Sequence, residues 1–155
     1  MQQPDALNQV AEFHRTFKHP ILESPTIPNE KRSALRVELI SEELKELEEA
    51  IKDKDLVEIA DALCDIQYVL SGAILEFGLA DKFKALFDEV QRSNMSKACD
   101  NEQQAIDTVE FYKKEKDTEC YYKEVEGKWL VYRTADEKTI KSIYYSPADL
   151  KSILK

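Results

Sequence analysis

Two acidic clusters lie in neighbouring segments of the chain, and the spacing within each cluster suits metal chemistry. They consist of Glu42, Glu43 and Glu46 in the first segment and of Glu58, Asp61 and Asp65 in the second. Residues three or four positions apart face the same side of a helix, so each cluster would form one stripe on a helix. Carboxylate oxygens are the ligands that Mg²⁺, Mn²⁺ and Ca²⁺ prefer in proteins. The residue types and their spacing therefore favour a site for a divalent cation.

The two clusters also lie at matching distances from the turn that should join their segments. Glu46 precedes Asp53 by seven residues, and Asp61 follows Asp53 by eight. With a rise of about 1.5 Å per residue, an antiparallel helix pair places both clusters roughly 10 Å from the turn. We therefore expect the carboxylates of the two helices to converge on one place.

An exposed acidic helix face is the competing interpretation of these clusters. Exposed faces usually interleave Lys or Arg with the acids, which offsets the repulsion between like charges. No Lys or Arg occurs between Leu56 and Ala80, although the second acidic cluster lies in that segment. Because buried carboxylates without partners are costly, the sequence favours a bound cation over an exposed face.

Other kinds of metal site fit the sequence less well. Zinc sites usually contain Cys or His, and the two histidines, His14 and His19, lie outside the acidic segments. The Glu-x-x-His pairs of helical di-iron sites and the loop ligands of an EF-hand are absent. Mg²⁺ that is held by helix carboxylates normally shares its shell with substrate phosphates. Mg²⁺ together with a phosphate-bearing ligand is therefore the preferred interpretation.

The apolar pattern predicts that helices position these clusters. Helices are expected over residues 5–18, 29–52, 55–77, 81–94 and 101–116. Asn29 is an expected N-cap, and Gly78 is an expected helix stop. The apolar residues expected to face the core are Ile59, Leu63, Ile66, Leu70, Ala73 and Phe77 in the third helix, and Phe83, Leu86, Phe87 and Val90 in the fourth.

The composition changes after Lys97, where aromatic and β-branched residues become frequent. Strands are expected over residues 120–125, 129–133 and 140–145, the first two joined as a hairpin. Ser146 and Pro147 predict the start of a last helix. The expected fold is an all-α core over residues 1–98 with a small β-containing appendage over residues 99–155.

Composition and charge limit the classes of function. Acids outnumber bases by 31 to 22, giving a net charge of -9, so a broad nucleic-acid-binding surface is not expected. No apolar run approaches the roughly 20 residues that span a bilayer, and the N-terminus lacks the pattern of a signal peptide. Cys64, Cys99 and Cys120 show no CxxC spacing, so we expect free thiols in a cytoplasmic protein without membrane partners.

The acidic clusters resemble a known signature. Glu42-Glu43-x-x-Glu46 followed by Glu58-x-x-Asp61 is similar to the EExxE…ExxD pattern of the all-α nucleoside triphosphate pyrophosphohydrolases. These are the MazG-like enzymes, related to phosphoribosyl-ATP pyrophosphohydrolase and the dimeric dUTPases. The segments that support the resemblance are residues 60–68, 87–97 and 145–150. The resemblance covers about residues 5–98, and the longer, more polar residues 99–145 depart from it.

The resemblance implies a four-helix bundle that assembles as a homodimer or a dimer of dimers, with Mg²⁺ that Mn²⁺ can replace. The implied metal ligands are Glu43, Glu46, Glu58 and Asp61, and Glu42 or Glu46 would orient the attacking water. The residues expected to contact substrate or support the site are Asn94, Lys97, Asp65 and Arg92. Helix-end capping by Asn94 and Lys97, and a solvated Arg92, are the alternatives. Tyr68 and Phe17 would stack on a base or pack in the core.

The reaction that the resemblance implies is hydrolysis of a nucleoside or deoxynucleoside triphosphate to the monophosphate and pyrophosphate. House-cleaning of the nucleotide pool is the expected role. The alternatives are a non-catalytic helical module that binds nucleotide and a module that binds a basic protein partner.

Overall fold

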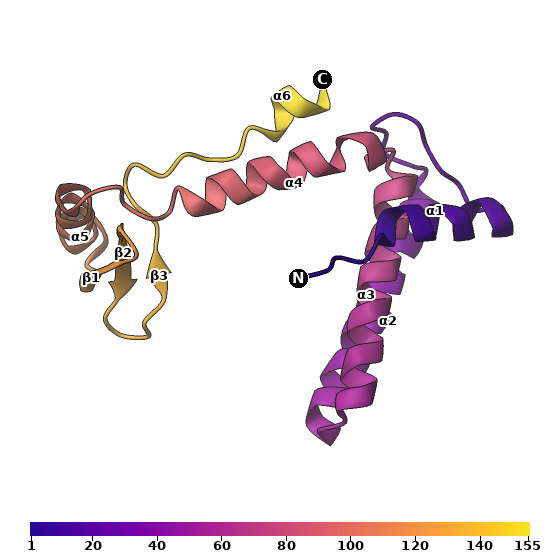
Figure 1. Cartoon of the computed structure of the whole chain (residues 1–155), viewed down its shortest axis with the longest axis horizontal. Helices are drawn as coiled ribbons and strands as arrows, with labels where there is room; N and C mark the ends of the chain where they lie inside the picture. The colour runs from indigo at the N-terminus through magenta and orange to yellow at the C-terminus, as the bar shows by residue number, and fades with distance from the viewer. The chain divides into compact units, whose positions relative to one another are not determined.

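The computed structural model describes all 155 residues, which form six helices and one three-stranded sheet (Figure 1). The chain divides into two compact units, residues 1–84 and 85–155. Each unit has its own cluster of buried apolar residues. The division falls inside helix α4, Ala80–Met95, whereas the sequence predicts a boundary at residue 98.

Three helices form the bulk of the first unit: α1, Ala6–Phe17, α2, Glu30–Asp53, and α3, Leu56–Glu76. Helices α2 and α3 pair as a hairpin, and α1 packs on α3 (Figure 1). Asn29 caps α2 as predicted, because its side chain accepts a hydrogen bond of 3.0 Å from the backbone N–H of Arg32. Asp55 caps α3 in the same way and so sets the register of the second acidic cluster.

Gly78 ends α3 as predicted, and the structure explains why a glycine is required there. Its φ of +65° lies in the left-handed region, which side chains with a Cβ rarely adopt. A Cβ at this position would also lie 1.9 Å from the carbonyl oxygen of Ser24. The glycine therefore lets the loop before α2 lie against the end of α3, where the N–H of Thr26 donates to the carbonyl of Phe77 over 3.0 Å.

Helices α2 and α3 each expose a stripe of large apolar residues within one chain. The stripes repeat every seven residues and consist of Val37, Leu44 and Ile51 on α2 and of Leu56, Leu63 and Leu70 on α3. The expected core positions Leu63 and Leu70 are 52% and 40% exposed, so for the single chain this part of the prediction is wrong. A hairpin of two helices with α1 on one side cannot bury every apolar face of both helices.

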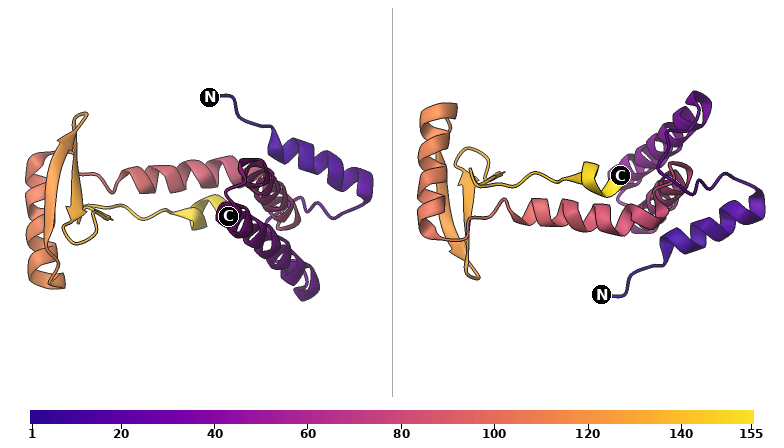
Figure 2. Two further views of the ribbon diagram at one scale, coloured as in Figure 1. Left: turned by 90° about the horizontal axis from the view of Figure 1, so that it is seen from below. Right: turned by 90° about the horizontal axis from the view of Figure 1, so that it is seen from above.

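The second unit consists of the last part of α4, helix α5, the sheet and helix α6. Its elements are α5, Glu102–Lys116; β1, Cys120–Val125; β2, Lys128–Arg133; β3, Thr139–Ile140; and α6, Leu150–Leu154. The strands are antiparallel in the order β1-β2-β3, and α5 lies along the sheet (Figure 2). The predicted hairpin is confirmed, with Glu126 and Gly127 both at positive φ, as a tight two-residue turn requires.

The predicted third strand is shorter than expected, and the last helix begins later than expected. Strand β3 ends at Ile140 because the next residues bond elsewhere: the N–H of Ser142 donates to the carbonyl of Lys97 over 3.0 Å. Helix α6 begins at Leu150 after an Asp149 cap, rather than at Pro147. The carbonyl of Pro147 instead accepts a 3.0 Å hydrogen bond from Arg92, which keeps this segment extended.

Residues 142–149, called the C-terminal strap below, run beside α4 within the second unit (Figure 2). Ser93 donates to the hydroxyl of Tyr145 over 3.0 Å, and Glu89 accepts from the backbone N–H of Asp149 over 2.8 Å. The predicted inward position of Leu86 is confirmed. Phe87 and Val90 were expected to face inward as well, but they are 63% and 38% exposed because the strap covers another side of the helix.

No single helix is long and apolar enough to cross a membrane, and only the bent pair of α3 and α4 taken together meets that test by length and composition. All three cysteines are free thiols.

Candidate active site

Glu43, in the middle of α2, lies where the two acidic clusters meet. Its Oε2 atom is buried and has no hydrogen-bond partner. Burial raises the pKa of Glu43 above its ordinary value, and four neighbouring carboxylates raise the pKa further. In order of their effect these are Glu46, Asp65, Glu42 and Asp61. Acids from both helices therefore act on the charge of Glu43.

Most of the predicted ligands are exposed around this buried oxygen. Glu42, Glu46, Glu58 and Asp61 are exposed, whereas Asp65 is half-buried. No three His, Cys, Asp or Glu side chains are grouped closely enough to enclose a metal ion within one chain. Asp61 and Asp65 of α3 thus influence Glu43 of α2, whereas Glu58 is not among the acids that shift its pKa. The convergence of all the predicted ligands on one ion, and the role of each as a ligand, stay predictions.

The residues around Glu43 fit a hard divalent cation. A buried acceptor without a donor is unfavourable, and surrounding it with further carboxylates makes it more so. A cation would offset both effects at once. Because all the nearby groups are carboxylates, the donor set suits Mg²⁺ or Mn²⁺ rather than a metal that prefers Cys or His.

A cavity of about 240 Å³ lies between α1, α2 and α3 on the same helix faces. Aromatic rings from three segments line it: Phe13, His19 and Tyr68. The ring of Phe13 stacks on that of His19 with 5.8 Å between centroids and meets the edge of Tyr68 at 5.7 Å. Val10, Leu35 and Leu39 add apolar surface. The cavity is thus suited to a flat ring rather than to a large flexible ligand.

A buried ion-pair network forms one wall of this cavity. Glu76 is 1% exposed and accepts hydrogen bonds from both Arg32 and Arg36. Burial alone would raise the pKa of Glu76, but the hydrogen bonds and charges of the two arginines outweigh it and lower the pKa. The Nε atom of Arg36 is buried and has no hydrogen-bond partner. The wall therefore keeps one unused donor.

Gly72 makes room for this network. A Cβ at Gly72 would lie 2.6 Å from Nη1 of Arg36 and 3.1 Å from Nε2 of His14. Nδ1 of His14 lies 2.9 Å from the carbonyl of Pro20, so Nδ1 carries the proton and Nε2 is left as an acceptor. Burial lowers the pKa of His14, and the nearby positive charge of Arg36 lowers it further, partly offset by the bond to Pro20.

The cavity and the acids share one stripe of each helix. Arg36 precedes Glu43 by seven residues, which is about two turns and roughly 10 Å along α2. Tyr68 follows Asp65 by three residues, about one turn along α3. A ligand about 10 Å long that lies along the hairpin would therefore reach both.

The pairing of Arg32 and Arg36 with Glu76 was not predicted from the sequence, although the sequence contains a signal for it. Glu76 lies in the same cation-free stretch of α3 that marks the acidic cluster, so it too needs a positive partner from elsewhere. Arg32 and Arg36 are four residues apart on α2 and thus share one face. Because the pairing joins residues 40 or more positions apart, only the packed hairpin reveals it.

The remaining predicted substrate residues belong to the second unit. Lys97 lies just beyond the end of α4, and its Nζ donates over 2.8 Å to the side chain of Asn94 in the last turn of that helix. Arg92 pairs with Glu89 at 2.7 Å and also donates to the strap. The hydrogen bonds from Arg92 and from the N–H of Asp149 lower the pKa of Glu89 to about 2. Substrate contacts by Asn94, Lys97 and Arg92 stay predictions.

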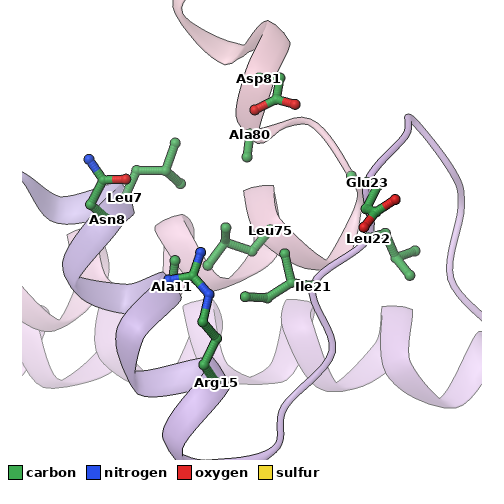
Figure 3. Close-up of a pocket in the computed structure, with 11 residues that line it drawn as sticks. Leu7, Asn8, Ala11, Arg15, Ile21, Leu22, Glu23, Leu75, Ala80 and Asp81 are labelled. Atoms are coloured by element: carbon green, nitrogen blue, oxygen red, sulfur yellow. The ribbon is translucent and has the colours of Figure 1, made fainter.

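A second, larger hollow of about 790 Å³ lies between α1, the loop that follows it and the end of α3 in the first unit (Figure 3). Leu7 and Leu75 form part of its apolar floor, and Arg15, Glu23 and Asp81 stand around it (Figure 3). None of the predicted metal or substrate residues lines this hollow. The chemistry is therefore expected at the acids and the adjoining aromatic cavity.

Comparison with known proteins shows the family of the chain. Residues 10–94 match the model of the phosphoribosyl-ATP pyrophosphohydrolase family, a range that includes both acidic clusters and the cavity. An uncharacterised protein of Acanthamoeba polyphaga mimivirus is 34% identical, over 94% of this chain and 94% of that protein. Membership of the family implies a hydrolase that cleaves a pyrophosphate linkage. The chain belongs to the phosphoribosyl-ATP pyrophosphohydrolase family, within the MazG-like nucleoside triphosphate pyrophosphohydrolase superfamily.

Proposed function

We propose that the chain hydrolyses a nucleoside or deoxynucleoside triphosphate to the monophosphate and pyrophosphate in a Mg²⁺-dependent reaction. The observation that supports this most is the buried, unpaired oxygen of Glu43 among four other carboxylates. Removal of non-canonical or surplus nucleotides from the pool is the role that we assign to this activity.

Each acid has a part in this proposal. Glu43, Glu46, Glu58 and Asp61 would hold Mg²⁺, and Asp65 would support them from α3. When bound, Mg²⁺ would neutralise the phosphates and lower the pKa of a water molecule. Glu42 or Glu46 would accept a proton from that water as its oxygen attacks the α-phosphorus. The bond from the α-phosphorus to the bridging oxygen then breaks, and pyrophosphate leaves.

The aromatic cavity would hold the base of the nucleotide. Phe13, His19 and Tyr68 offer flat apolar surface against which a base can pack. The separation of about two helical turns between the cavity and Glu43 suits a base at one end and phosphates at the other. Phe17, which lies 4.4 Å from Phe13 by ring centroids but is 61% exposed, would contribute at the rim.

Two chains would complete the four-helix bundle. The exposed stripes of α2 and α3 repeat every seven residues, which is the spacing of helices that pack along a seam. A homodimer, alone or as half of a dimer of dimers, would cover these stripes. Sedimentation of Leu44→Glu and Leu63→Glu should then show a smaller mass than the parent protein. An unchanged mass in both variants would contradict the dimer.

The test of the activity is release of pyrophosphate from a panel of ribo- and deoxynucleoside triphosphates with Mg²⁺ or Mn²⁺. Glu43→Gln and Asp61→Asn should lose at least about a hundredfold in kcat/KM, because each removes a group that stabilises the transition state. Glu38→Gln, which changes an exposed acid five residues before Glu43 on α2, is the matched control and should keep its activity. The proposal is wrong if the parent protein releases pyrophosphate from none of these nucleotides, or if Glu43→Gln keeps full activity.

A further inference from the structure

We infer that His14 is a positioning residue for the base of the nucleotide. It fastens the loop that follows α1 to the end of that helix, and so holds the ring of His19 as one side of the aromatic cavity before a ligand arrives. The inference rests on the proposed nucleotide site and gives a role to a buried histidine that the proposed reaction does not use. His14 then acts on the binding of the base and not on the reaction at the phosphates.

Two hydrogen bonds from His14 fix the path of the chain after α1. Its carbonyl accepts from the backbone N–H of His19 over 2.8 Å, and Nδ1 of its ring donates to the carbonyl of Pro20 over 2.9 Å. Just before them, Lys18 has a φ of +59°, in the left-handed region, where the chain turns back on the helix. The main chain is therefore held on both sides of the Cα atom of His19.

The ring of His14 is itself fixed in place. His14 is 2% exposed, and its Nε2 lies 3.4 Å from Nη2 of Arg36, which donates to the buried Glu76. A Cβ added at Gly72 would lie 3.1 Å from the same Nε2. Burial lowers the pKa of His14, so the ring is neutral near pH 7, with its proton on Nδ1 for the carbonyl of Pro20. The ring cannot turn away from the loop without losing its contacts with α2 and α3.

The residue that His14 positions lies in the cavity. The ring of His19 stacks on Phe13 with an interplanar angle of 17°, and both rings line the cavity. His19 is exposed and its ring forms no hydrogen bond, so its main chain and its ring contacts hold it. A ring that is fixed before binding spares part of the entropy cost of ordering it against a base.

The experiment separates the base of the substrate from its phosphates. His14→Leu keeps a side chain of similar size but removes both interactions of the ring. For the nucleoside triphosphate that the parent protein hydrolyses best, KM should rise about tenfold, the order of one stacking contact. The value of kcat should stay within about twofold, because the base is held equally in the ground state and the transition state. The Ki of Mg²⁺-tripolyphosphate, which has phosphates but no base, should not change.

Rescue and coupling test whether His14 acts through the loop and His19. His14→Asn can place an amide N–H near the position of Nδ1, so KM should return most of the way to the parent value. His19→Ala should raise KM, and adding His14→Leu to it should raise KM little further, because effects that pass through one residue do not add. The control is Thr26→Ala, which removes a 2.9 Å hydrogen bond to the carbonyl of Ser24 in the same loop and should leave KM unchanged.

Four results would overturn the inference: an unchanged KM in His14→Leu or in His19→Ala, an equal rise in the Ki of tripolyphosphate, a KM in His14→Asn as high as in His14→Leu, or additive effects in the double variant. If His14→Leu does not fold by circular dichroism, His14→Gln takes its place, because its longer side chain moves the amide away from the carbonyl of Pro20. A parent protein that releases no pyrophosphate from any nucleotide would instead contradict the proposed function, and the inference with it.

Discussion

At the scale of single residues, the site depends on groups that are buried without their usual partners. Oε2 of Glu43 is buried near other acids, and Nε of Arg36 is buried in a residue that lines the cavity. Neither atom has a hydrogen-bond partner. Natural proteins leave few buried polar atoms unpaired. Two such atoms lie on one face of α2, about two turns apart, and this is the face on which we expect a ligand to bind.

The unfavourable position of Glu43 predicts opposite effects of Glu43→Gln with and without metal. Without metal, the variant should be more stable by at least a few tenths of a kcal/mol, because like-charge helix pairs cost about 0.2–0.5 kcal/mol each. With Mg²⁺ at a hundred times its Kd, the parent should gain about 2.7 kcal/mol and the variant much less. Thermal unfolding with EDTA or Mg²⁺ measures both effects. A parent protein indifferent to Mg²⁺ would contradict the metal site.

His14 predicts a pH dependence of stability. Its pKa in the folded protein is lowered from the ordinary value of 6.5, so below that value the unfolded chain takes up a proton that the folded protein does not. The free energy of unfolding should therefore fall as the pH drops from 6.5 towards the lowered pKa of the folded state. Urea unfolding of the parent and of His14→Gln over this range measures the difference. Equal slopes would exclude His14 as the cause, and His19→Gln serves as the comparison.

At the scale of elements, the parts that local signals control were predictable from the sequence. Helix α2 was expected over residues 29–52 and spans Glu30–Asp53, because the Asn29 cap and the turn before Asp55 act on their immediate neighbours. The start of α6 was not predictable, because Arg92 holds the carbonyl of Pro147 from a distant part of the chain. The influence of Asp61 and Asp65 on Glu43 agrees with helix geometry, whereas the cavity depends on contacts between three helices.

The two glycines with positive φ offer a matched test of how the hairpin is anchored. Gly127→Ala should cost about 1–2 kcal/mol, the penalty of a left-handed residue, because nothing lies within 4 Å of the added carbon. Gly78→Ala should cost clearly more, since its added carbon would also meet the carbonyl of Ser24 at 1.9 Å. Equilibrium unfolding in urea gives both values. Equal losses in the free energy of unfolding would mean that the loop beside Gly78 can move away from the added carbon without a further loss of stability.

At the scale of the whole molecule, negative charge is concentrated in the unit that contains the acids. Residues 1–84 contain 17 acidic and 10 basic residues, a net charge of -7, whereas residues 85–155 contain 14 and 12, a net charge of -2. A free triphosphate would be repelled by the first unit. The species that binds is therefore expected to be the complex of Mg²⁺ with the nucleotide.

The hydrogen bond between the Ser142 N–H and the Lys97 carbonyl has a consequence for how the chain can be shortened. The two atoms of this bond lie 3.0 Å apart, so the chain enters and leaves the 99–140 segment at neighbouring points. The segment is therefore an insertion between α4 and the strap. Segments whose ends are adjacent are readily inserted or removed. We expect a protein with a short Gly-Ser link in place of residues 99–140 to remain folded and to release pyrophosphate within a few-fold of the parent rate. Circular dichroism and the pyrophosphate assay measure the two outcomes, and a folded but inactive product would show that the segment takes part in substrate binding.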